Sequence, residues 1–474
     1  MEDKLAGYAP RMVSYSCNTF DKDGTMKRIL LVVMSALLVL LGACQSAPSG
    51  TQTATPEAVS AETPAAVSST PLPTATPDPT PSPTPAPTRI TVMAVGDIMC
   101  LGAQLSAAKS GGSYGFDYAF AQIKDTISSA DLAIGNLETL IASGHPYTAI
   151  GSGSDDEPTP TPGAGESEAP SEEPSTDPSG EVGFAPDFAF ADIALEPIHG
   201  TQRQPLLDGP RINGPESFLS AAVGAGFDVL TNANNHINDY GTDGIEKTLA
   251  MLDAYGIPHT GAYASADDKV PLLVDVEGIK IGIVAYTDHL NRSAGANMDL
   301  INLYDADEVA EDIAAAKEAG ADFTIVYIHW GTENTHTVTR TQRTIAQHIA
   351  DSGADLILGS HPHCTQEFEL LETDGGTVPV IYSLGNFISS MAGRALNRDG
   401  MILKFVLEKD GVTGETTLQD LSYIPTLCTN TDEGSFVVLP ADEASIASSE
   451  YAARLQDSRA RTIDVLGEEI AKPE

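Results

Sequence analysis

Short apolar runs that each end on a metal-binding type of residue are the feature that most constrains this chain. Five such runs lie between residues 90 and 363. They are typical of strands buried on both faces. Helical patterns separate most of them, which favours a largely parallel sheet with these ends along one edge. The runs are Ile90–Gly96 before Asp97, Leu132–Gly135 before Asn136 and Glu138, Phe227–Leu230 before Asn234, Asn235 and His236, Phe323–Ile328 before His329, and Leu356–Gly359 before His361 and His363.

The stretch from Thr231 to Asp239 is especially rich in amides and also contains a histidine. Asn can bind a metal through its carbonyl oxygen, and a His beside a carboxylate can be held as a proton donor. An Asn-rich turn that caps a helix would explain a single Asn–His pair equally well. We prefer a metal site because four other strands end in the same way.

The N-terminus predicts export. Met26–Arg28 is a short basic segment, and the apolar run after it has the ~7–15 residues of a signal peptide rather than the ~20 of a membrane-spanning helix. Leu41–Cys44 resembles a bacterial lipobox, in which Cys44 becomes lipidated. We therefore expect residues 1–44 to be a leader whose true start is Met26. The mature protein would then be extracytoplasmic and anchored by lipid to the bacterial membrane.

Two segments have compositions that predict disorder. Residues 45–88 are rich in Pro, Thr, Ser and Ala, which favours an extended polyproline II spacer. Residues 151–181 are acidic and contain no basic residue, so they are expected to be a solvated insert, with a cation-collecting or partner-binding loop as the alternative. What remains is a folded domain over 89–440 and a helical tail over 441–474, in which we expect one helix from Glu443 to Arg461.

Local signals also predict individual elements of this domain. Gly214-Pro215-Glu216 opens an amphipathic helix that Gly224–Gly226 ends. Val270–Val276 and Ile279–Tyr286 read as antiparallel strands around Glu277-Gly278. The formal net charge of −41 argues against nucleic acid and anionic lipid surfaces as electrostatic partners.

Six motifs in order resemble the CapA family of capsule-synthesis proteins linked to poly-γ-glutamate. The resemblance covers Ile90 to Lys409, interrupted by the acidic insert. Because that family is similar to calcineurin-like metallophosphoesterases, the resemblance implies an α/β fold, a metallophosphoesterase-like four-layer α-β-β-α sandwich with a metal site at the strand ends. The motifs are Gly96-Asp97, Gly135–Glu138, Asn234–Gly241, His329–Glu333, Gly359–His363 and Tyr382–Phe387.

The resemblance also implies a role for individual residues. The metal ligands would be Asp97, Glu138, Asn235, His329, His361 and His363. His236 would act as the general acid, with Asp239 orienting its ring. Asn136, Asn234 and Asn386 are expected to support the ligands from behind.

One departure from the enzyme pattern bears on the number of metals. Those enzymes begin with Asp-x-His, whereas this chain has Asp97-Ile98-Met99, so a ligand of the first metal is missing. The second set, which contains Glu138 and His329, is complete, so the sequence supports one metal site more strongly than two. Carboxylate, amide and imidazole ligands suit Mn²⁺, Fe²⁺ or Zn²⁺, and such an ion lowers the pKa of a bound water toward about 7.

Two functions of different classes are consistent with these motifs. The first is a surface lipoprotein in the synthesis, export or trimming of an anionic polymer, by resemblance poly-γ-glutamate, with metal-dependent hydrolysis of a phosphoester or of the polymer's amide bonds. The second is a non-catalytic membrane-tethered subunit that binds the polymer or its synthase subunits and keeps the metal for structure. Met99 favours the second, whereas Asn235-His236 favours the first.

Overall fold

The computed structural model describes residues 14–20, 26–30, 85–149, 209–391, 395–468 and 471–474. The predicted lipobox at Cys44, the acidic insert and nearly all of the predicted spacer lie outside the described residues. No helix in the described ranges combines the length and the apolar character needed to cross a bilayer.

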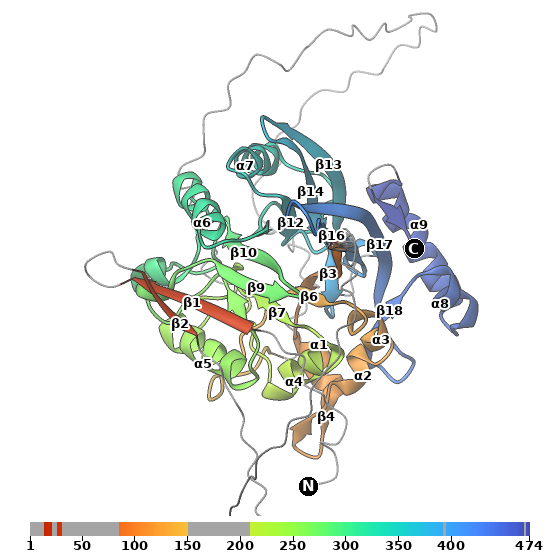
Figure 1. Ribbon diagram of the computed structural model, residues 1–474. Helices are drawn as coiled ribbons and strands as arrows, with labels where there is room; N and C mark the ends of the chain where they lie inside the picture. Colours follow the sequence, from red (N-terminus) through yellow and green to blue (C-terminus); the bar gives the residue numbers. More distant parts are fainter. Residues whose placement is uncertain (1–13, 21–25, 31–84, 150–208, 392–394, 469–470) are drawn as a thin grey trace, which may run out of the picture.

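Two β-sheets packed face to face form the centre of the fold (Figure 1). The first contains β1 (Ser14–Phe20), β2 (Met26–Leu30), β9 (Leu272–Val276), β10 (Ile279–Thr287), β11 (Phe323–His329), β12 (Leu356–Ser360), β13 (Thr365–Thr373) and β14 (Gly376–Leu384). Its order is β13-β14-β12-β11-β10-β9-β1-β2.

The second sheet contains β3 (Thr88–Ile98), β6 (Leu132–Leu137), β7 (Val229–Thr231), β8 (His259–Thr260), β15 (Asn386–Ile388), β16 (Asp399–Lys409), β17 (Thr416–Asn430), β18 (Phe436–Pro440) and β19 (Lys472–Pro473). Its order is β18-β17-β16-β3-β6-β7-β8, with β15 paired to β3 and β19 to β17. A separate small hairpin joins β4 (Lys109–Ser110) to β5 (Ser113–Tyr114).

Helices cover the outer face of each sheet (Figure 1). The second sheet is covered by α1 (Gly102–Ala108), α2 (Asp117–Phe120), α3 (Lys124–Ile127), α4 (Glu216–Ala225) and α5 (Gly241–Ala254). The first is covered by α6 (Ala306–Glu318) and α7 (Arg340–Asp351). Short 3₁₀ turns lie at Ala266–Asp268, Gly295–Leu300 and Ala395–Asn397. The predicted four-layer α-β-β-α sandwich is confirmed.

Strand β3 illustrates why the central runs are apolar at almost every position. Ile90, Val92 and Ala94 point into the core between the two sheets. Met93 and Val95, which alternate with them, point into the core beneath the helices. Both faces of the strand are therefore buried, so a polar residue is tolerated only where the strand ends.

The polar strand ends belong to two sheets, so the expectation from the strand pattern that they lie along one edge of a largely parallel sheet is wrong. In the second sheet β3, β6 and β7 run parallel, and Asn136 lies between Asp97 and Thr231 in register. In the first sheet β10, β11 and β12 run parallel, and His329 lies opposite Ser360. Apolar runs identify strands but carry no information about which strands hydrogen-bond to one another.

Gly385 carries the chain from the first sheet to the second beside these strand ends. It follows β14 with a positive φ of 72°, and Asn386 then pairs with Asp97 of β3. The approach is so close that a Cβ atom on Gly96 would lie 1.8 Å from the carbonyl oxygen of Gly385. Gly96 therefore permits a contact between backbones that a side chain would prevent.

We expect Gly96→Ala to lower the free energy of unfolding by roughly 2–3 kcal/mol, because the added methyl group forces two backbone segments apart. The same displacement would lengthen the hydrogen bond from the Asp97 amide to the Gly385 carbonyl, which is 3.1 Å. Urea denaturation of the full chain measures the change. The control is Gly224→Ala on α4, where an added Cβ meets no atom within 4 Å. Equal stability of Gly96→Ala and the parent would contradict this account of the crossing.

The single helix predicted from Glu443 to Arg461 is wrong. The structure has α8 (Glu443–Ser448) and α9 (Ala452–Leu466), separated by an extended residue at Ser449. The Ser448 hydroxyl donates to the carbonyl of Ala444, a local bond of the kind that competes with helix continuation. α9 then packs on β17 and β13 and closes one end of the sandwich.

Candidate metal centre

All six predicted metal ligands meet where strands of both sheets end. Three lie at or just after the ends of strands of the second sheet, and three at or just after the ends of strands of the first. Each is at most 3 % exposed although its side chain is polar. Burial of so many polar groups in one place requires that they satisfy one another or bind an ion. The residues are Asp97, Glu138, Asn235, His329, His361 and His363.

The donor atoms form two groups. The first group, which is the set around Glu138 and His329 that the sequence predicts to be complete, surrounds Nε2 of His329. Asn235 Oδ1 and His361 Nδ1 each lie 3.1 Å from this nitrogen. Glu138 Oε1 lies 3.6 Å from it. The four atoms are one carboxylate oxygen, one amide oxygen and two imidazole nitrogens, a mixed set suited to Mn²⁺, Fe²⁺ or Zn²⁺.

The second group is centred on His363. Its Nδ1 lies 3.1 Å from Asp97 Oδ2 and also 3.1 Å from Asn386 Oδ1. Its Nε2 lies 3.9 Å from Glu138 Oε1, so Glu138 belongs to both groups. Met99, two residues after Asp97, is buried in an apolar cluster that includes Met391. The second group therefore has one imidazole donor where the first group has two.

Glu138 is the strongest indication that this site binds a cation. The side chain is fully buried, and neither carboxylate oxygen has a hydrogen-bond partner among the described residues. Burial, together with the negative charge of Asp97, raises the pKa of Glu138 well above its ordinary value. A carboxylate in this position is costly without a positive charge beside it, so the donor set fits a divalent ion.

The histidines differ in their preferred charge state. Burial holds the pKa of His329 well below its usual value, which favours the neutral imidazole that binds metals. For Asp97 burial acts in the opposite direction and favours a higher pKa. The hydrogen bond and the charge interaction with His363 outweigh burial, so the pKa of Asp97 is lowered. Burial opposes charge on His363, but Asp97 raises the pKa of this histidine in turn.

Neighbouring polar groups hold the ligands in place. Asn136 Nδ2 donates to Asp97 Oδ1 at 2.8 Å, and Ser360 Oγ lies 2.8 Å from His329 Nδ1. Asn234 Nδ2 donates to the carbonyl of Leu137 at 2.9 Å, and Asn386 Nδ2 donates to the carbonyl of His363 at 3.2 Å. Such contacts fix ring and carboxylate orientations around metals.

The backbone of the last motif is strained at both histidines. His361 has a φ of 93° and His363 a φ of 57°, in the region that non-glycine residues rarely adopt. Each such residue costs about 1–3 kcal/mol and persists only where the surrounding structure requires it. Here the strain aims two successive histidines toward the two groups around Glu138.

His236 and Asp239 form a pair beside the first group. Nδ1 of His236 lies 2.8 Å from Oδ2 of Asp239, and the residue is 5 % exposed. The same carboxylate oxygen accepts the amide of Ile212 at 2.8 Å, which fixes the carboxylate. Nδ1 of the ring thus faces Asp239, which leaves Nε2, on the side of Asn291, as the nitrogen that can take part in proton transfer.

Sequence reasoning missed the loop after β10. Asn291 Nδ2 lies 3.2 Å from His236 Nε2, and Asn291 Oδ1 accepts from Asn235 Nδ2 at 3.3 Å, so one side chain joins a ligand to the proton donor. The centres of the His289 and His361 rings are 4.4 Å apart. The signal was present, because Ile279–Tyr286 is a sixth apolar run and Asp288-His289 closely follows it. Trp330, by contrast, has a structural role: its ring stacks on Tyr382 and its indole N–H donates to the Tyr382 carbonyl at 2.8 Å.

Comparisons with known proteins identify relatives of this chain. The family model described as bacterial capsule synthesis protein PGA_cap matches residues 91–154 and 182–391, more than half of the chain. The PGA biosynthesis protein CapA of Bacillus subtilis (strain 168) is 34% identical over 188 residues, 39% of this chain and 48% of the relative. The capsule biosynthesis protein CapA of Bacillus anthracis is 29% identical over 206 residues, 42% and 49% of the two chains.

The chain thus spans about half the length of the curated relatives it matches. Among solved structures, a phosphatase of Mycoplasma pneumoniae shares 12% sequence identity, with a TM-score of 0.37 over 78% of this chain and 99% of its own. Similarity at that level does not support a shared activity.

Proposed function

The chain belongs to the family of bacterial capsule synthesis proteins described as PGA_cap, and we propose that it is a metal-dependent hydrolase acting on an anionic surface polymer, poly-γ-glutamate. The reaction would be cleavage of the polymer's amide bonds during synthesis, export or trimming, with phosphoester hydrolysis as the other reaction that such a site can perform. The observation that carries the proposal is the buried Glu138 carboxylate, whose oxygens accept no hydrogen bond from the described residues, within a four-donor group.

The proposed location is outside the cytoplasm, with a lipid on Cys44 tethering the domain to the membrane. The support is the basic and apolar leader that ends in Leu41–Cys44. The name of the Bacillus anthracis relative, a capsule biosynthesis protein, agrees with this location because a capsule lies outside the cell.

The residues of the site would have two kinds of role in such a reaction, metal binding and proton donation. Glu138, Asn235, His329 and His361 would hold the ion, and Asp97 and His363 complete the site toward Asn386. A divalent ion there supplies Lewis acidity and makes water more acidic. His236, held at Nδ1 by Asp239, would deliver a proton from Nε2 to the leaving group.

The alternative function is a tethered, non-catalytic subunit that binds polymer or synthase partners. The observation in its favour is Met99, which lies in an apolar cluster where the related enzymes have a metal ligand. In this alternative the ion only stabilises the fold. Hydrolysis by the metal-loaded protein separates the two functions, since only the first predicts it.

The first test is the metal content of the full chain by elemental analysis. We expect about one Mn²⁺ or Zn²⁺ ion per chain after loading, because one donor group is complete and the other lacks a ligand. The variant with both His329→Ala and His361→Ala should retain almost none. The control is His348→Ala on α7, a histidine whose ring nitrogen Nε2 lies 2.8 Å from the Ala306 carbonyl oxygen.

Metal in the parent justifies an assay with oligo-γ-glutamate and with phosphoesters. A parent that stays metal-free after loading would rule out the hydrolase. A metal-loaded parent that cleaves neither kind of substrate would leave the tethered subunit as the function.

A further inference from the structure

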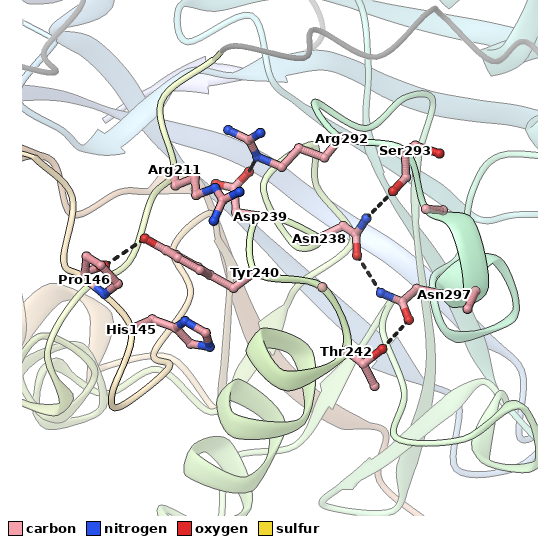
Figure 2. Close-up of a pocket in the computed structure, with 13 residues that line it drawn as sticks. His145, Pro146, Arg211, Asn238, Asp239, Tyr240, Thr242, Arg292, Ser293 and Asn297 are labelled. Carbon is pink, nitrogen blue, oxygen red and sulfur yellow. Dashed lines mark hydrogen bonds and ion pairs between the residues drawn. The ribbon is translucent and has the colours of Figure 1, made fainter.

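A cavity of about 720 Å³ opens beside the His236–Asp239 pair (Figure 2). Asp239 lies in its wall and also holds the His236 ring, so the cavity is one side chain away from the proposed proton donor. The remaining wall comes from separate segments: the loop after β6, the segment before α4, the start of α5 and the loop after β10. Its principal side chains are His145, Arg211, Tyr240, Thr242, Arg292 and Asn297.

Two arginines converge on this cavity, as Figure 2 shows around Asp239. Arg292 is held from two sides, because its Nε lies 3.5 Å from Asp239 Oδ1 and its Nη2 donates to the Gly209 carbonyl at 2.7 Å. The Arg211 guanidinium lies 5.0 Å from the centre of the Tyr240 ring and makes no ion pair with a described carboxylate. Arg211 is exposed, so its hydrogen-bonding edge is available to a ligand.

Tyr240 is itself fixed, which turns Arg211 into a positioned group. The Tyr240 hydroxyl donates to the Pro146 carbonyl at 2.9 Å. The His145 ring stacks on the Tyr240 ring with a centroid separation of 4.3 Å. A guanidinium that rests on an immobilised ring loses less freedom on binding than a free surface arginine, and it still offers its planar fork to an anion.

The charges of the cavity favour an anionic group. Among the described residues of its wall, Arg211 and Arg292 contribute two positive charges and Asp239 one negative charge. A carboxylate matches both the charge and the bidentate geometry of arginine.

We propose that Arg211 and Arg292, with Tyr240 beneath Arg211, form a binding subsite for one carboxylate of an acidic polypeptide. Because Asp239 contacts both Arg292 and His236, a carboxylate bound here holds a neighbouring amide of the same polymer next to His236. This proposal rests on the proposed function and adds to it the residues that select the substrate. It needs no metal for the binding step itself.

The test is calorimetric binding of a short oligo-γ-glutamate to the full chain, with chelator present to prevent turnover. Arg211→Gln should weaken binding by about tenfold or more, as expected for loss of a charge-assisted hydrogen bond. The control is Arg454→Gln, because Arg454 also lies over a tyrosine, 5.5 Å from the centre of the Tyr451 ring, but does not line the cavity. Inorganic phosphate serves as the competing probe.

Unchanged affinity in Arg211→Gln, or no binding of the oligomer to the parent, would overturn the subsite. Displacement of the oligomer by inorganic phosphate at equal concentration would overturn the preference for a carboxylate. If binding depends on Arg211 but the protein never hydrolyses the oligomer, the subsite stands and the proposed hydrolase is refuted. If the protein hydrolyses the oligomer with a KM that Arg211→Gln leaves unchanged, the hydrolase stands and the subsite is refuted.

Discussion

Glu138→Gln is expected to abolish metal binding and, in the same protein, to make the metal-free fold more stable. The glutamate lies in both donor groups, so the change removes a shared anionic ligand. Without metal, its buried carboxylate has no hydrogen-bond partner among the described residues and lies near Asp97. Neutral glutamine avoids that cost, and we expect roughly 1–3 kcal/mol of added stability at pH 8. A residue retained only for packing would show the opposite sign.

The pH dependence of this gain has a definite direction. Burial raises the pKa of Glu138 in the folded state well above its ordinary 4.5. The folded state therefore holds this proton more tightly than the unfolded state does. As the pH rises from about the ordinary value through the raised pKa, the metal-free parent loses stability. Glutamine does not titrate, so the stability difference between the two proteins should be small at pH 5 and larger at pH 8.

Urea denaturation with chelator at the two pH values measures this difference, and elemental analysis measures the metal. The control is Asp355→Asn, since burial also raises the pKa of Asp355 but this carboxylate accepts the Thr324 amide at 2.7 Å. It should leave metal binding intact. A Glu138→Gln protein that still binds metal, or that is less stable than the metal-free parent at both pH values, would contradict the assignment of Glu138.

His236→Asn is expected to lower kcat by about 10²–10⁴-fold while the metal content stays at the parent's level. The reason is that His236 contacts Asp239 and Asn291, and its predicted role is proton donation rather than metal binding. Asp239→Asn should reduce kcat less, because the ring stays in place while its charged form loses support. Turnover of the cleaved substrate and elemental analysis of the same preparations are the two measurements.

A second histidine–aspartate pair provides the control for that experiment. His259 Nε2 lies 3.3 Å from Asp253 Oδ1, away from the strand ends that form the site. His259→Asn should leave both kcat and metal content unchanged. Loss of metal in His236→Asn would instead make this residue a ligand, and an unchanged kcat would remove it from the reaction.

The sequence by itself determined the local elements and the chemical types at the site. The helix bounded by Gly214-Pro215 and Gly226 is α4 (Glu216–Ala225), because its end signals act within a few residues. The strands ending at Asp97 and His329 were readable because a strand buried on both faces excludes polar residues until it ends.

Only the tertiary structure decided which of these ends meet, and how closely. The division into two sheets depends on hydrogen bonds between segments far apart in the chain, such as the pairing of Asn386 with Asp97. The same holds for Asn291 beside His236 and for Arg211 near Arg292. The residue type alone gives the chemical group of a side chain, whereas the distance between two side chains depends on every contact that packs the chain between them.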